Sequence, residues 1–153
     1  MKKWALFPLF AIATIFLLAA PCLAGSVGVN KAIFASRIEN FGIYDETSNR
    51  YKSGSTALIY LEVVDFMLTE AKGTYSLDLS VDLSVLDSSG KEVARQSDML
   101  AWARTFKSKV HDVYFTLNVT FNGWPPGDYT LVVTVKDNMA RTFNPVKMPV
   151  EIF

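Results

Sequence analysis

The sequence predicts an all-β protein: a single antiparallel β-sandwich of about seven strands in residues 25–153, preceded by a signal peptide in residues 1–24. Three observations predict the sandwich. Apolar and polar residues alternate strictly in three separate segments, which is the pattern of strands with one buried face. Turn-forming residues separate the segments at nearly regular intervals. No repeat, low-complexity tract or linker divides the chain, so we expect one domain.

Residues 1–24 have the layout of a secretory signal peptide. Two lysines precede a long apolar run, and small residues stand before a cleavage site after Ala24. An uncleaved membrane anchor is the alternative, but the run is short and no basic cluster follows it. Lipid attachment at Cys22 is not expected, because Pro21 occupies the place of the small residue that precedes a lipidated cysteine.

These features predict an exported protein, periplasmic or extracellular, with no transmembrane segment after signal cleavage. Cys22 is the only cysteine of the chain, so the mature domain holds no disulfide.

The first part of the domain is less regular than the rest. The segment 31–41 is expected to form the first strand, and the polar segment 42–55 a surface loop. The segment 56–66 is apolar at both odd and even positions, which is typical of a central strand covered on both faces. Within it, Glu62 comes nearest to a catalytic acid. The alternatives are that Glu62 faces water or pairs with an arginine such as Arg37 or Arg95.

The clearest strand lies in residues 76–85. Its apolar residues occupy one face and serine or aspartate the other, and the segment ends at the turn 87–91. The apolar residues are Leu77, Leu79, Val81, Leu83 and Val85.

The segment 97–110 is ambiguous. Met99, Trp102, Phe106 and Val110 have helical spacing, whereas Leu100, Trp102, Arg104 and Phe106 have strand spacing. Because the neighbouring segments are all strands, we favour an extended structure and keep the helix as the alternative.

Three further strands complete the domain. Residues 113–121 and 129–136 alternate strictly, with Val113, Phe115, Leu117, Val119 and Phe121 on one face of the first. The last strand, 142–153, contains Pro145 and Pro149, which cannot donate to a neighbouring strand. We therefore expect part of it to lie at an edge or to contain a bulge.

The loop 122–128 connects two of these strands. Pro125 and Pro126 end the first strand, and Gly127 permits the turn.

The order of strands and the segment Pro125–Asp137 resemble immunoglobulin-like sandwiches. In that family, a tyrosine near the start of the penultimate strand hydrogen-bonds back to the preceding corner, and Tyr129 stands in its place. Leu131 occupies the position of the cysteine of antibody domains, so the chain departs from them. The segment is also similar to macroglobulin-type domains and to the family of the Bacillus intracellular proteinase inhibitor. The resemblance covers about the last half of the chain and implies architecture, since this fold hosts many functions.

The residues required by most enzymes are missing from the sequence. His111 is the only histidine, and the adjacent Asp112 points to the opposite face of a strand, which does not fit a hydrolase triad. Asp78 and Asp82 share a strand face but lie more than about 10 Å apart, and residues 45–49 lack the pattern of an EF-hand. We expect no metal, no cofactor and no enzymatic activity. The nearly neutral charge also gives no reason to expect nucleic-acid binding.

The strongest candidates for contact with a ligand are Trp102, Arg104, Phe106, Lys107 and Lys109, and also Trp124. Aromatic residues and arginine are enriched at the energetic centres of interfaces. The alternative is an ordinary strand with Trp102 in the core and basic residues protecting an edge.

We therefore expect non-catalytic binding, of an envelope protein first, with a free edge that could accept a partner strand. Two alternatives stay open. They are carbohydrate or peptidoglycan binding through Trp102, Phe106 and Trp124, and proteinase inhibition through the loop 122–128. The oligomeric state stays open too.

Overall fold

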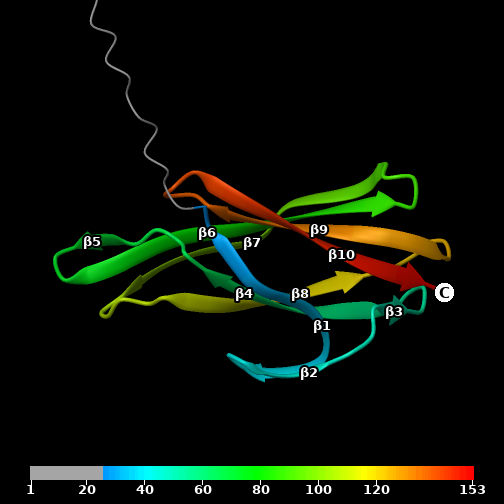
Figure 1. Cartoon of the computed structure of the whole chain (residues 1–153), viewed down its shortest axis with the longest axis horizontal. Coiled ribbons are helices and arrows are strands. Elements are labelled where there is room, and N and C mark those ends of the chain that lie inside the picture. Colours follow the sequence, from blue (N-terminus) through cyan, green and yellow to red (C-terminus); the bar gives the residue numbers. More distant parts are fainter. Residues whose placement is uncertain (1–25) are drawn as a thin grey trace, which may run out of the picture.

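The computed structural model describes residues 26–153, which form ten β-strands in two sheets and no helix (Figure 1). The predicted signal peptide, its cleavage site after Ala24 and Cys22 lie outside the described residues. Within residues 26–153, we find no helix long and apolar enough to span a bilayer. The prediction of an all-β domain with two sheets is confirmed.

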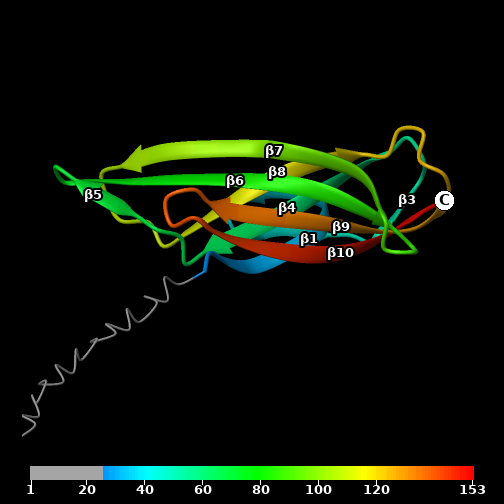
Figure 2. The ribbon, with the colours of Figure 1, turned by 90° about the horizontal axis from the view of Figure 1, so that it is seen from above.

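Each sheet joins strands from distant parts of the chain. The four-stranded sheet has the order β2 (Ile43–Glu46), β1 (Gly28–Asn40), β4 (Thr56–Val64) and β8 (Asp112–Thr120). The six-stranded sheet has the order β3 (Arg50–Tyr51), β10 (Thr142–Ile152), β9 (Gly127–Asp137), β6 (Thr74–Asp87) and β5 (Thr69–Ala71), and β7 (Glu92–Phe106) also pairs with β6. Figure 2 shows β7, β6, β9 and β10 side by side.

The alternating patterns locate the core correctly. The apolar residues of β6, β8 and β9 that were expected to share a face are buried between the two sheets, as packed sheets require, except Tyr129, which is partly buried. The buried residues are Leu77, Leu79, Val81, Leu83, Val85, Val113, Phe115, Leu117, Val119, Leu131, Val133 and Val135.

The prediction of a purely antiparallel sandwich of seven strands is wrong in one region. The segment 42–55, expected to be a loop, contains β2 and β3, and β3 pairs with β10 in parallel. The Arg50 side chain stabilises the β3–β10 pair by donating two hydrogen bonds to the Glu151 carboxylate, at 2.8 and 2.9 Å. A two-residue strand is too short to show an alternating pattern in the sequence. It forms only because the distant strand β10 lies beside it.

The segment 97–110 is extended through Phe106, so the helical alternative is wrong. A bulge interrupts β7: residues 97–99 lie opposite the single residue Asp82 of β6. Asp98 has a φ of 49°, its N–H donates to the Asp82 carboxylate at 2.8 Å, and Lys136 pairs with both carboxylates at 2.7 and 2.8 Å. Partial burial opposes the ionisation of Asp82, but the bonds from Lys136 and Asp98 outweigh it and hold the pKa below its usual range.

Strand β4 is covered on both faces, as predicted. Its residue Tyr60 points to the outer face of the four-stranded sheet and is nevertheless fully buried. The turn after β1 folds over Tyr60, and the Gly42 N–H donates to the Tyr60 hydroxyl at 3.0 Å. The Tyr114 ring stacks on the Tyr60 ring, and the Tyr44 ring packs against it at a tilt.

Glu62 accepts hydrogen bonds from Tyr60 and Asn30 on this covered face. It pairs with neither of the arginines considered from the sequence. Arg37 pairs with Glu39 and Asp45, and Arg95 pairs with Glu92.

Candidate functional site

The loop 122–128 is a corner that is bonded to the body of the domain. The Tyr129 hydroxyl donates to the Pro125 carbonyl at 3.0 Å, as the sequence predicted. The Trp124 ring packs edge-on against Phe121 at 5.4 Å and lies 5.2 Å from the Tyr129 ring. Ser53 Oγ donates to the Trp124 carbonyl at 2.9 Å. Trp124 is therefore partly buried and closes the end of the sandwich, while Pro125, Pro126 and Gly127 stay exposed.

Trp102, Arg104 and Phe106 share one face of β7, as predicted, and this face points inward. They pair with Leu79, Leu77 and Tyr75 of β6. Trp102 and Phe106 are partly buried and pack against the core.

The Trp102 ring meets Phe115 of the opposite sheet edge-on at 5.4 Å. The Arg104 guanidinium lies over the Trp102 ring, 5.7 Å from its centroid. Trp102 thus belongs to the margin of the core, and Arg104 shields it from solvent.

These residues lie along one side of the sandwich, where β7 and β8 face each other as end strands of the two sheets. The exposed loop 107–111, with Lys107 and Lys109, connects them (Figures 1 and 2). Within residues 26–153, no hydrogen bond joins β7 to β8. We call the space between these two strands the open side.

The backbone of β8 presents unpaired groups to the open side. Phe121 N–H donates to the Ser55 carbonyl at 3.0 Å, just beyond the end of the β4–β8 pair. Because bonded and non-bonded pairs alternate in an antiparallel ladder, every second residue of β8 bonds to β4 and the others point away from it. The residues that point away are Tyr114, Thr116, Asn118 and Thr120. Their N–H and C=O groups have no backbone partner in the part of the chain that the structure describes.

Strand β8 is the least protected edge among the described strands. It pairs with β4 in unbroken register over nine residues and contains no proline, no glycine and one charge, Asp112. Proteins usually protect sheet edges by shortening them, by charges, by proline or by bulges. Strands β2, β3 and β5 are short, and β7 has its bulge and several charges.

Strand β10 is protected by its prolines. It pairs with β9 along its length but with β3 only at its last two residues, so Pro145 and Pro149 face a free edge. The prediction that part of this strand lies at an edge is confirmed.

A hollow of about 180 Å³ opens between β7 and the second half of β8. Two residues of β7 create it: Ala94 and Gln96 pair with Val85 and Leu83, at positions that face the core. A small and a polar side chain therefore stand where a filled core would have large apolar ones. Residues from three strands and the corner line the hollow: Leu83, Val85, Ala94, Arg95, Gln96, Met99, Asn118, Val119, Thr120 and Trp124.

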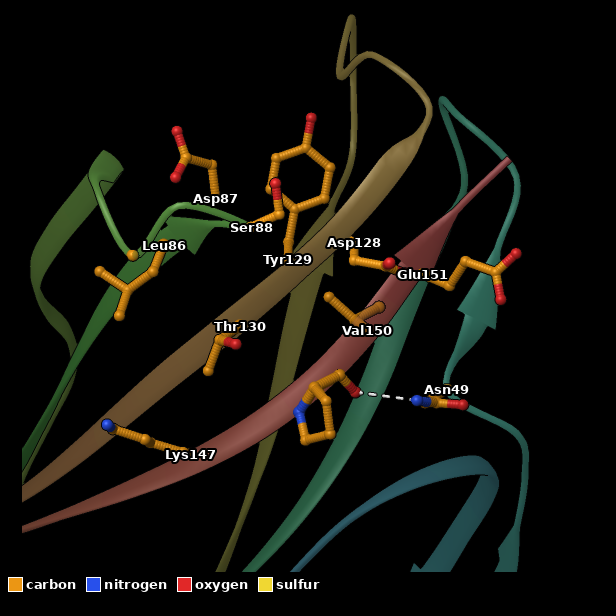
Figure 3. Close-up of a pocket in the computed structure, with 12 residues that line it drawn as sticks. Asn49, Leu86, Asp87, Ser88, Asp128, Tyr129, Thr130, Lys147, Val150 and Glu151 are labelled. Atoms are coloured by element: carbon orange, nitrogen blue, oxygen red, sulfur yellow. Dashed lines mark hydrogen bonds between the residues drawn. The ribbon is translucent and has the colours of Figure 1, made fainter.

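A larger hollow, of about 430 Å³, lies on the outer face of the six-stranded sheet beside the turn after β6 (Figure 3). Three of its polar side chains, Asn49, Asp87 and Glu151, are bonded within the domain. Asn49 donates to the Pro149 carbonyl at 3.1 Å, and Glu151 pairs with Arg50. The side chain of Ser89 and the backbone of the same turn donate to Asp87 and lower its pKa. We interpret these polar groups as stabilising turns and strand ends.

The acidic residues considered from the sequence are bonded to neighbouring side chains. Within residues 26–153, no three or more His, Cys, Asp or Glu residues are grouped as metal ligands would be. Asp78 accepts a hydrogen bond from Asn138, and Asp82 pairs with Lys136. His111 lies exposed in the loop before β8.

Comparison with known proteins supports the fold and shows no family. No protein-family model and no curated protein matches the chain. Among solved structures, the C-terminal domain of Wzt aligns with a TM-score of 0.53 at 9% identity, covering 84% of this chain and 74% of that one. This likeness fits the β-sandwich architecture and carries no function.

Two other solved structures align with lower TM-scores. Spo0M, a sporulation control protein from Bacillus subtilis, aligns at 0.39 and 13% identity over 84% of this chain and 49% of its own. The structural genomics target SoR45 aligns at 0.34 and 13% identity over 84% of this chain and 82% of its own.

The sequence reasoning identified part of the open side and missed the rest. Trp102, Arg104, Phe106 and Trp124 do border it, but β8 and the hollow were not anticipated. Two signals were present. Residues 113–121 contain no charge, and Ala94 and Gln96 stand at inward positions of the preceding strand. Recognising the second signal requires the register of β6 and β7.

Proposed function

We propose that this domain is a non-catalytic binding module that takes an extended segment of a partner protein onto the edge of β8. The observation that carries this proposal is the free edge itself: a regular strand of nine residues without proline, glycine or bulge, in which Tyr114, Thr116, Asn118 and Thr120 have outward N–H and C=O groups. An added strand would satisfy these groups by β-augmentation, in which main-chain hydrogen bonds supply affinity.

The geometry of the open side supports a strand there. A strand paired with β8 would extend the four-stranded sheet along the open side, and alternate side chains of it would point toward the six-stranded sheet. At the second half of β8, those side chains meet the hollow lined by Ala94, Gln96 and Trp124. Side-chain pockets of this kind supply specificity in strand addition.

Export and the immunoglobulin-like assignment remain part of this proposal. The layout of residues 1–24 supports export, which places the partner in the envelope or outside the cell. The bond from the Tyr129 hydroxyl to the Pro125 carbonyl supports the immunoglobulin-like assignment.

Glycan binding and proteinase inhibition have less support. Trp102, Phe106 and Trp124 are partly buried against the core, which leaves little ring surface for stacking on a sugar. The loop 122–128 is bonded to Ser53 and Tyr129, whereas an inhibitory loop must protrude into a protease cleft.

The substitution Thr116→Pro tests the proposal. It removes an N–H that points to the open side and leaves the bonds between β8 and β4 in place, as proline does on natural edge strands. Thr116→Val, which keeps the N–H, is the matched control. We expect Thr116→Pro to abolish binding of a partner captured from envelope extracts and Thr116→Val to retain it.

Hydrogen exchange supplies the second measurement. Binding should slow exchange of the amides of Tyr114, Thr116, Asn118 and Thr120 in the wild-type domain. Protection confined to another surface, or a partner that binds Thr116→Pro as tightly as wild type, would contradict the proposal.

A further inference from the structure

We infer the chemistry of the segment that binds at the open side: an extended peptide with one apolar anchor residue and acidic residues about six positions away. This inference rests on the proposed function, since it specifies the occupant of the β8 edge. Two separate features of the open side carry it, one at each end of β8.

The anchor follows from the hollow at the second half of β8. The hollow has a volume of about 180 Å³, opens to solvent, and is lined by Arg95, Gln96, Asn118 and Thr120 as well as by apolar residues. Leu83, Val85, Val119 and Trp124 supply apolar surface. A side chain of the size of leucine or phenylalanine therefore fits the hollow and removes apolar surface from water.

The acidic residues follow from uncompensated positive charge at the first end of β8. Arg104, Lys107 and Lys109 form no ion pair with the described residues, and no acid stands between Met99 and Val110. Asp112, the nearest acid in the sequence, is not paired with them.

These cations flank the entrance to the open side. Arg104 lies over Trp102 at its margin, and Lys107 and Lys109 lie in the loop that leads into β8. Acidic side chains on the partner would complement this charge.

The spacing between the two features follows from strand geometry. From Asp112 to Asn118, β8 advances six residues, or roughly 20 Å at about 3.3 Å per residue. A paired strand advances at the same rate, so its anchor and its acidic residues stand about six positions apart.

Synthetic peptides test the inference directly. The lead peptide is a ten-residue strand sequence of threonine and valine, with leucine as anchor and two glutamates near the sixth position from it. One control replaces both glutamates by glutamine, and another replaces the leucine by serine. All peptides are made in both directions, since parallel and antiparallel strands place anchor and acids in opposite order. Binding to the whole domain is measured by fluorescence anisotropy at low and high salt.

We expect the glutamine peptide to bind about fivefold more weakly than the lead peptide at low salt, with the difference lost in high salt. The serine peptide should bind at least about tenfold more weakly.

Substitutions in the domain should remove the preference for glutamate and the preference for leucine separately. Changing Arg104, Lys107 and Lys109 together to glutamine should remove the preference for glutamate. Ala94→Leu fills the hollow and should weaken binding of the leucine peptide alone. Ala103→Leu, on the outer face of β7, is its control.

Failure of the inference is distinguishable from failure of the proposed function. If the peptides bind wild type and not Thr116→Pro, but show no preference for glutamate or leucine, the edge site stands and its inferred occupant is wrong. If no peptide binds, or all bind Thr116→Pro equally well, the edge site itself is wrong.

Discussion

Replacing Trp102 by alanine distinguishes a core residue from a contact residue. A fully buried tryptophan removes about 150–250 Å² from water. Trp102 is partly buried, so about half of this area at about 25 cal/mol per Å² gives roughly 2–3 kcal/mol. Its ring contacts with Phe115 and Phe106 add about 1 kcal/mol, for a total of about 3–4 kcal/mol. This agrees with the cost of about 3–5 kcal/mol for removing large aromatic side chains from cores.

Urea denaturation followed by circular dichroism measures this loss. With an m-value of about 2 kcal/mol per molar urea, the midpoint of Trp102→Ala should fall by roughly 1.5–2 M. Arg104→Ala is the control, because it removes only the exposed contact with the ring and should lower the midpoint by less than about 0.5 M. A midpoint for Trp102→Ala that matches wild type would refute the reasoning and would indicate that Trp102 is a contact residue.

Three other substitutions should change the stability of the domain in different directions. Tyr129→Phe breaks the hydrogen bond that ties the corner and should lower the free energy of unfolding by about 1 kcal/mol in urea denaturation. Tyr51→Phe should instead raise it by about 1 kcal/mol, because the Tyr51 hydroxyl is buried without a partner among the described residues; an unchanged or lower midpoint would contradict this. Lys136→Met removes the cation between Asp82 and Asp98. Because the pKa of Asp82 is lowered in the folded protein, its contribution to stability is present above about pH 4 and is lost as the pH falls through the folded pKa. The variant should therefore lose less stability than wild type between about pH 5 and pH 3 in thermal melts, and parallel curves for the two proteins would oppose this account.

The elements predicted well from the sequence are those with a local signal. Alternation placed Leu77 to Val85 and Val113 to Phe121 on buried faces, because a strand next to a core must alternate. The corner was predictable too, because Pro125, Pro126 and Gly127 end a strand and Tyr129 stands in the place of the corner tyrosine in the resemblance to immunoglobulin-like sandwiches. The helical spacing of Met99, Trp102 and Phe106 competed with the strand spacing because both periods fit so few residues, and pairing with β6 decided it.

The candidate site was only partly predictable, because it is defined by the absence of a neighbouring strand along the outer edge of β8 among the described residues. Trp102 and Arg104 were candidate contact residues because of their residue types. In the structure, however, the Trp102 ring packs against Phe115 at the margin of the core. The free groups of Thr116 and Asn118 carry no sequence signal of their own. They are free because no other strand lies beside them.

The sequence by itself determined that the domain is a β-sandwich, which side chains form its core and where its corner lies. These depend on alternation and turn chemistry over a few neighbouring residues. The tertiary structure alone decided which strands lie at edges, that β3 pairs in parallel with β10, and that Ala94 and Gln96 leave a hollow beside β8. The physical reason is that an edge and a hollow are relations between segments far apart in the chain. Their position depends on register and sheet order, which no local pattern specifies.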